Sequence, residues 1–160
     1  IGMPGCGKST VGVVLAKHMG YRFIDSDLLI QEREHRLLSE IIEQEGLDRF
    51  DQIEEEVNAS IEAEHAVIAT GGSVVYGPKA MEHLRNIGTV VYLKLSYEEI
   101  ADRLGDLTAR GVSVREGQTL RNLYDERIPL YEKYAHVVID AEHQWLRDTV
   151  KVIRQRLEQL

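Results

Sequence analysis

The chain has 160 residues, of which 43% are hydrophobic and 29% are charged. This balance is typical of a globular domain and excludes a disordered, collagen-like or coiled-coil chain. With 19 Lys and Arg against 27 Asp and Glu, the net charge of −8 argues against a general nucleic-acid or anionic-membrane binder. No apolar run is long enough to predict a membrane span. The single cysteine, Cys6, allows no internal disulfide and favours a reducing, cytoplasmic location.

Apolar periodicity predicts helices that alternate with short strands. Helices are expected over 7–19, 28–34, 37–44, 48–64, 79–86, 97–104, 119–134 and 144–160. Strands are expected over 21–24, 66–69, 89–95 and 137–139. The glycine-rich stretch 105–118 interrupts the pattern and predicts a mobile loop, and Pro129 should bend or interrupt its helix. Alternating strands and helices predict a single α/β domain over 1–160, with a parallel sheet covered on both faces.

The strongest functional signal lies at the start of the chain. Residues 2–9 read Gly-Met-Pro-Gly-Cys-Gly-Lys-Ser and fit the phosphate-loop pattern G-x-x-x-x-G-K-[ST] in full. The glycines let main-chain N–H groups curl around phosphate, and the following helix adds its positive N-terminal dipole. Lys8 is expected to reach the β- and γ-phosphates of ATP, and Ser9 to ligate Mg²⁺. The alternative is a glycine-rich turn capped by Ser9.

The context of this loop adds two expectations. Such a loop normally follows a buried strand, so we expect the first strand of the sheet to lie largely upstream of Ile1. The nucleotide-binding residues of the loop are expected to be Gly5, Cys6, Gly7, Lys8, Ser9 and Thr10.

Two acids follow the first predicted strand. Asp25 and Asp27 lie where the carboxyl ends of parallel strands bind ligands. One carboxylate can hold the water shell of Mg²⁺ while the other contacts a substrate hydroxyl. The alternative is that Ser26 or Asp27 only caps the next helix.

Together these residues resemble the shikimate kinase family of P-loop kinases, and the resemblance covers nearly the whole chain. Residues 2–27 are close to the family pattern, and Thr70-Gly71-Gly72 is similar to its glycine-rich substrate loop. Residues 126–131 read Glu-Arg-Ile-Pro-Leu-Tyr, similar to the family's E-R-x-P-L-Y segment. The resemblance implies a three-layer α/β/α P-loop kinase fold with a five-stranded parallel sheet and a mobile lid. It also implies ATP, Mg²⁺ and phosphoryl transfer to a ring hydroxyl, with shikimate as the default acceptor.

The resemblance also implies roles for particular residues. The acceptor would be contacted by Asp27 and by Arg127, the latter through a carboxylate, while Gly71 and Gly72 line its pocket. The helical region over about 28–64 would bind the substrate, and the lid would span about 104–118. Arg103 would lie over the adenine, and Arg110 would close on the phosphates. The catalytic residues would be Lys8, Asp27 and Arg110, and the metal ligands Ser9 and Asp25.

The departures from the family gather on the acceptor side. Asp51 replaces an arginine that helps the family bind the shikimate carboxylate, and Ser73 replaces the third glycine of the substrate loop. The lid reads Arg-Gly-Val-Ser over 110–113, where the family has Arg-Pro-Leu-Leu. Arg49 is a poor substitute, because two residues turn a helix by about 200°.

These changes leave the acceptor open. Asp51 could pair with an ammonium group while Arg127 holds a carboxylate, which would suit a hydroxy amino acid such as homoserine or threonine. It could equally be a solvated acid, or pair with a nearby arginine and leave the pocket untouched. Arg115 and Arg121 are expected to be solvated, with a role in the lid as the alternative.

Two other classes of protein compete with this interpretation. A non-catalytic nucleotide sensor would keep the ATP site and lose transfer, but the intact Asp25, Asp27 and Arg127 argue against it. A nucleoside monophosphate kinase would want more arginines around its acceptor than the acidic surroundings of Asp51 offer. We therefore expect a monomeric enzyme whose partners are ATP and a small-molecule acceptor, with no nucleic acid and no membrane.

Overall fold

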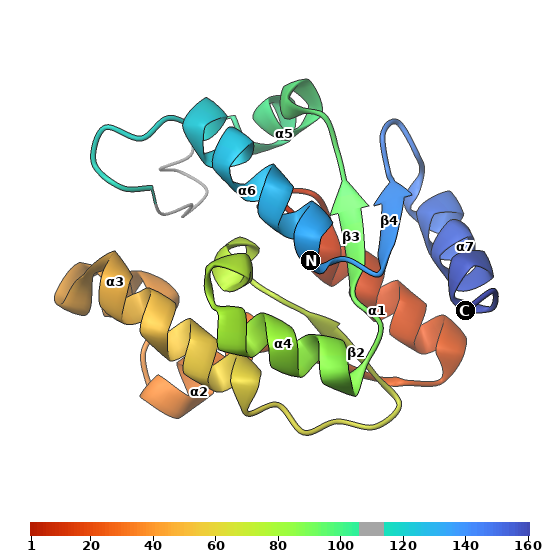
Figure 1. The fold of residues 1–160 in the computed structure, drawn as a ribbon, viewed down its shortest axis with the longest axis horizontal. Coiled ribbons are helices and arrows are strands. Elements are labelled where there is room, and N and C mark those ends of the chain that lie inside the picture. Colours follow the sequence, from red (N-terminus) through yellow and green to blue (C-terminus); the bar gives the residue numbers. More distant parts are fainter. Residues whose placement is uncertain (106–113) are drawn as a thin grey trace.

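A computed structural model of the chain describes residues 1–105 and 114–160 (Figure 1). Its helices are α1 (Lys8–Met19), α2 (Ser26–Glu34), α3 (Leu38–Ala59), α4 (Pro78–Ile87), α5 (Tyr97–Leu104), α6 (Leu120–Tyr134) and α7 (Leu146–Leu157), with a 3₁₀ helix η1 (Gly72–Tyr76). Its strands are β1 (Arg22–Asp25), β2 (Ala66–Ala69), β3 (Val91–Lys94) and β4 (Val137–Asp140). The predicted order of helices and strands is confirmed for the described residues, most boundaries lie within two positions of the predicted ones, and η1 was not predicted.

The described strands form two parallel pairs, β1 with β2 and β3 with β4. Asp25 pairs with Ala69, and Lys94 pairs with Asp140. The carboxyl ends of the four strands therefore lie along one edge, in two neighbouring pairs. Parallel strands need long crossover connections, which the intervening helices provide. The edge beyond these strand ends is where ligands bind in open α/β sheets.

The two edges of β3 have different partners. Val90 and Lys94 accept main-chain hydrogen bonds from the β4 side, at 3.1 and 3.0 Å. Ile1 lies on the opposite edge, where its N donates to Val91 O at 2.8 Å and its O accepts from Leu93 N at 3.0 Å. A cavity of about 660 Å³ separates β2 from β3 beside this residue. The fifth strand therefore stays a prediction.

Helices cover both faces of the strands (Figure 1). On one face α1 packs against β1, β2 and α7. On the other, α6 lies over β3, because Tyr131 stacks on Tyr92 with their ring centroids 5.1 Å apart. Both tyrosines are almost fully buried in the main hydrophobic core. None of the helices within the described ranges is long and apolar enough to cross a membrane.

A second, smaller core holds α2 against α3. It consists of Ile30, Ile41, Phe50, Ile53 and Val57. Four of these residues lie on α3, so burial of this one stripe fixes the helix against α2. The core thereby gives the predicted substrate-binding region a rigid base of its own.

The helix boundaries in this region differ from the prediction. Two helices were expected over 37–44 and 48–64, and α3 is indeed divided by a kink at Gly46, whose φ of 81° and ψ of 169° are not helical and are open to glycine. The helix ends at Ala59 instead of Glu64, because Ile61 turns inward and is only 5% exposed in the main core. Pro129 does not interrupt α6, which continues to Tyr134.

Candidate active site

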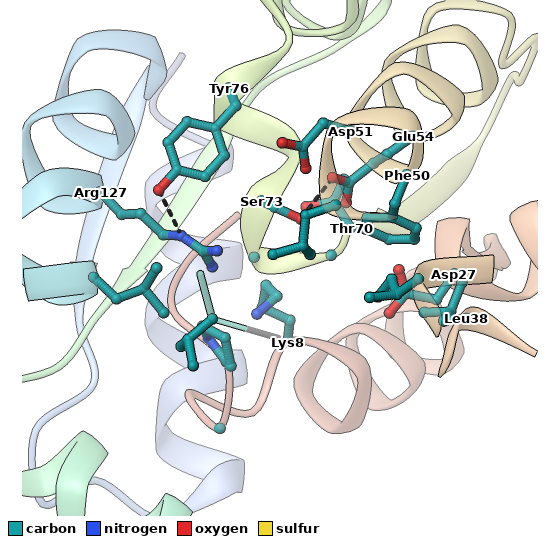
Figure 2. Close-up of a pocket in the computed structure, with 18 of the residues that line it drawn as sticks. Lys8, Asp27, Leu38, Phe50, Asp51, Glu54, Thr70, Ser73, Tyr76 and Arg127 are labelled. Atoms are coloured by element: carbon teal, nitrogen blue, oxygen red, sulfur yellow. Dashed lines mark hydrogen bonds between the residues drawn. The ribbon is translucent and has the colours of Figure 1, made fainter. Parts of the chain in front are cut away.

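One large cavity of about 1130 Å³ opens at the carboxyl edge of β1 and β2. Its floor is the loop before α1, and its wall on the other side comes from α3, η1 and α6 (Figure 2). The predicted site residues that line it are Gly5, Gly7, Lys8, Ser9, Thr10, Asp27, Asp51, Gly71, Gly72 and Arg127. The structure thus joins the predicted phosphate-binding residues to the predicted acceptor-binding residues in one space.

The glycine loop has the curled backbone that its sequence predicts. Gly5 and Gly7 take φ values of 77° and 94°, in the region that disfavours side chains. A Cβ on Gly5 would lie 2.9 Å from Leu104 Cδ2, so the loop also needs glycine there to fit against α5. Lys8 Nζ donates to the main-chain oxygens of Gly2 and Met3, each at 2.9 Å, which holds its ammonium group over the loop. Cys6 is buried in the core, as a small residue of the loop should be.

Ser9, which lines the cavity, contacts Asp25 at the end of β1. Ser9 Oγ donates to Asp25 Oδ2 at 3.1 Å, although 16 positions separate the two residues. Asp25 Oδ1 accepts from Asp27 N at 3.0 Å, so Asp25, and not Ser26 or Asp27, is the residue that caps α2. A hydroxyl and a carboxylate are oxygen ligands of the kind that Mg²⁺ prefers. The donor set therefore fits a magnesium ion bound beside the phosphate loop.

Asp27 lies in the cavity between the loop and α3 (Figure 2). Burial and the neighbouring Asp25 raise the pKa of its carboxyl group, while Lys8 opposes that shift. A carboxylate with a raised pKa accepts a proton more readily, as a group that receives one from a hydroxyl should. Asp27 thus has the position and the basicity that a proton acceptor in this cavity would need.

Glu54 is a buried carboxylate on the α3 side of the cavity, and it was not predicted from the sequence. Its side chain is 2% exposed, and Oε2 accepts from Ser73 Oγ at 2.6 Å, whereas Oε1 has no hydrogen-bond partner among the described residues. Burial raises its pKa to about 7, helped by Asp27 and Asp51 and opposed by the Ser73 hydrogen bond. Glu54 follows Asp51 by three positions on α3, which was the only sequence signal that could have placed it on the same helix face.

Arg127 is the buried cation of the acceptor side. It is 5% exposed on α6, and its Nε donates to Tyr76 Oη at 3.2 Å (Figure 2). Within the described ranges no carboxylate forms an ion pair with this guanidinium, which leaves its other N–H groups toward the cavity. A buried charge needs a counter-ion, so the geometry favours an anionic ligand at this position. Tyr76 has no motif around it, and no sequence signal would have found it.

The departures from the family pattern also have definite places. Asp51 lines the cavity and pairs with Arg115, with 3.3 Å between Oδ2 and Nη2, so the expected pairing with an arginine is present but lies at the pocket. Ser73 is held by Glu54. Arg49 points away from the cavity and pairs with Glu45 on the exposed side of α3, as the helical spacing predicts.

Of the two arginines expected at the nucleotide, Arg103 and Arg110, only Arg103 lies among the described residues. Arg103 lies on α5, with its Cβ 3.9 Å from where a Cβ of Gly5 would be, and its Nε donates to Glu99 Oε1 at 2.8 Å. It is therefore next to the phosphate loop. Arg110, with most of the predicted lid, lies outside the described residues.

The burial of Glu54 predicts a pH-dependent stability. Between pH 4.5 and about 7 the folded state holds a proton on Glu54 that the unfolded state has lost, so the free energy of unfolding falls as the pH rises. Glu54→Gln removes this cost, and we expect it to stabilise the protein at pH 8 by up to about 3 kcal/mol but to change little at pH 5. Urea unfolding at both pH values measures the difference. Glu32→Gln, the same charge change on the exposed side of α2, should show no such pH dependence.

Gly71 gives a second prediction, because its missing side chain makes room for two carboxylates. A Cβ at this position would lie 2.5 Å from Glu54 Oε1 and 2.9 Å from Asp27 Oδ1. Gly71→Ala should therefore displace Asp27 and lower kcat/KM for the acceptor about 10- to 100-fold. The KM for ATP should stay within about twofold, because the phosphate loop is untouched. Gly88→Ala, with nothing within 4 Å of its Cβ, is the matched control.

A curled glycine loop with Lys8 at a helix start, a serine–aspartate pair for magnesium and a joined acceptor pocket define a P-loop phosphotransferase. A family model described as shikimate kinase matches residues 4–158. A shikimate kinase of Clostridium botulinum (strain Eklund 17B / Type B) is 39% identical over 140 residues, which cover 87% of this chain and 84% of that protein. The chain belongs to the shikimate kinase family.

Solved structures agree with this assignment. The shikimate kinase from Acinetobacter baumannii in complex with shikimate superposes with a TM-score of 0.88 at 33% identity, covering 99% of this chain and 90% of that one. The shikimate kinase from Aquifex aeolicus gives a TM-score of 0.86 at 31% identity, covering 99% of this chain and 94% of that one. The family predicted from the motifs is therefore confirmed, and so are the α/β fold class and the family's use of ATP with Mg²⁺.

Proposed function

We propose that this protein transfers the γ-phosphoryl group of ATP to a hydroxyl group of shikimate. The observation that carries the proposal is the shared cavity, which faces Lys8 of the phosphate loop on one side and the buried Arg127 on the other. Shikimate is a carboxylate that also bears hydroxyl groups. Arg127 suits its carboxylate, and Asp27 lines the same cavity, where it can meet a hydroxyl.

The residues of the loop and those after β1 have different roles in the proposed transfer. Lys8 places a positive charge where the β- and γ-phosphates would lie against the main-chain N–H groups, and so stabilises negative charge as the phosphoryl group moves. Asp27 orients the attacking hydroxyl and accepts its proton. Ser9 and Asp25 would hold Mg²⁺, which supplies further charge neutralisation when bound.

The remaining nucleotide contacts are proposals of the same kind. Arg103 is supported by its position against Gly5, and we assign it to the base side of the nucleotide. Arg110 is assigned to the phosphates by the family pattern alone. We further propose a monomer in a reducing, cytoplasmic compartment, as the single cysteine suggests.

An acceptor screen tests this function. ADP release is measured with Mg-ATP and, in turn, shikimate, homoserine, threonine and gluconate. We expect the highest kcat/KM with shikimate, because the buried Arg127 favours an anionic acceptor and Asp51 is occupied by Arg115 instead of being free for an ammonium group. A clear preference for homoserine or threonine would overturn the assignment. ATP binding without turnover on any acceptor would instead indicate a nucleotide sensor.

A further inference from the structure

Asp51 pairs at the pocket with a cation, Arg115, that comes from a distant part of the chain. Arg115 places Nη1 2.8 Å from Asp48 Oδ1 and Nη2 3.3 Å from Asp51 Oδ2, so α3 grips its guanidinium at two points. Arg115 lies 64 positions after Asp51, and its side chain is 56% exposed, whereas that of Asp51 is 27% exposed. The side chain of an exposed arginine is free to move unless partners hold it in one position.

Both members of this pair line the large cavity, together with Arg127. The carboxylate of Asp51 is close enough to Arg115 and Arg127 for both charges to oppose the rise that burial causes in its pKa. Asp51 is therefore within electrostatic range of both guanidinium groups. A guanidinium carries five N–H donors, and Asp48 and Asp51 use only part of the Arg115 set.

We propose that Arg115 is a specificity residue for the acceptor carboxylate, and that Asp51 is the positioning residue that holds it at the pocket. The proposal rests on the proposed function, since it names the second cation of that same acceptor site. In this arrangement the acceptor carboxylate binds between Arg127 and Arg115.

The charges around the acceptor support this assignment. Without Arg115, the cations among the described lining residues would be Lys8 and Arg127, against the acidic side chains of Asp27, Glu43, Asp51, Glu54 and Glu126. Like charges repel more strongly in a partly buried site than in water. Arg115 offsets the carboxylate that replaces the family's arginine, so positive charge at this corner is supplied from the segment before α6 instead of from α3.

Steady-state kinetics with shikimate and Mg-ATP test the proposal in the full chain. We expect Arg115→Gln to raise the KM for shikimate about tenfold, the usual effect of one charged hydrogen bond, while kcat and the KM for ATP stay within about twofold. Arg121→Gln removes the same charge from an exposed arginine that pairs with Asp125 on its own helix, and should change neither KM. An unchanged shikimate KM in Arg115→Gln would overturn the proposal.

The double variant separates positioning from direct contact. If Asp51 acts through Arg115, Asp51→Asn should raise the shikimate KM in the parent but add nothing in the Arg115→Gln background. In that same background Asp51→Arg should return the KM toward the parent value, because it moves the cation to α3. Equal effects of Asp51→Asn in both backgrounds would show that Asp51 contacts the acceptor itself, against the proposal.

A neutral acceptor adds a readout that a structural defect would not produce. The methyl ester of shikimate lacks the carboxylate charge, so Arg115→Gln should change its KM by less than about twofold while it raises the KM for shikimate. An equal rise for both acceptors would contradict a role at the carboxylate. If the parent protein turns over no shikimate at all, the proposed function fails, and that result is distinct from each of these.

Discussion

We expect Lys8→Ala to lower kcat for phosphoryl transfer by about 10³-fold or more, the scale seen when a preorganised charge is removed from a transition state. Lys8 Nζ lies over the loop, held by the oxygens of Gly2 and Met3, and no other lysine or arginine among the described residues donates to these oxygens. The truncated side chain leaves the loop glycines and their N–H groups in place. The loss should therefore appear in turnover and in nucleotide affinity, and not in folding.

Two measurements check this expectation. Turnover is followed by ADP release with shikimate, and folding by thermal unfolding of the same preparation. Lys17→Ala, on the exposed side of the same helix, is the matched control and should keep parental activity. Near-normal turnover in Lys8→Ala would refute the assignment of the phosphate site.

The second large effect is expected at Asp27. Asp27→Asn keeps the shape of the side chain but removes the group that accepts the hydroxyl proton, so kcat should fall at least about 10²-fold. Burial and Asp25 raise the pKa of Asp27, so its active, ionised form is lost as the pH falls through a value above the ordinary one. We therefore expect kcat/KM for the parent to rise with pH along an acid limb that is absent in Asp27→Asn.

A pH series of initial rates, run at saturating ATP, measures both effects. Asp148→Asn, an exposed acid on α7, serves as the control for the loss of one negative charge. An unchanged rate in Asp27→Asn would mean that Asp27 only lines the pocket. Nucleotide affinity should remain within about twofold in either case, because the interactions of Ser9 and Lys8 are retained.

Much of the nucleotide side could be predicted from the sequence, because its residues are close together in the chain. Residues 2–9 form one loop and helix start, and the fit to a phosphate-loop pattern carries their geometry with it. Asp25 lies at a strand end, so its place at the sheet edge was predicted, and the family resemblance paired it with Ser9. Local chemistry and topology were sufficient for these positions.

The acceptor side was harder to predict, because it is built from contacts between distant segments. Glu54 reaches Ser73, Arg127 reaches Tyr76, and Arg115 reaches Asp51, over separations of 19, 51 and 64 positions. No local sequence pattern predicts any of these pairs. Arg115 looked like a solvated residue, and its place in the pocket wall follows only from the packing of the chain.

Phosphorus NMR of one reaction mixture tests phosphoryl transfer from ATP to shikimate. Protein, Mg²⁺, ATP and shikimate are incubated together, and the γ-phosphate signal of ATP is followed over time. We expect this signal to be replaced by that of a phosphate monoester on shikimate, in an amount equal to the ADP formed. Persistence of the γ-phosphate, or its conversion to inorganic phosphate alone, would contradict this expectation.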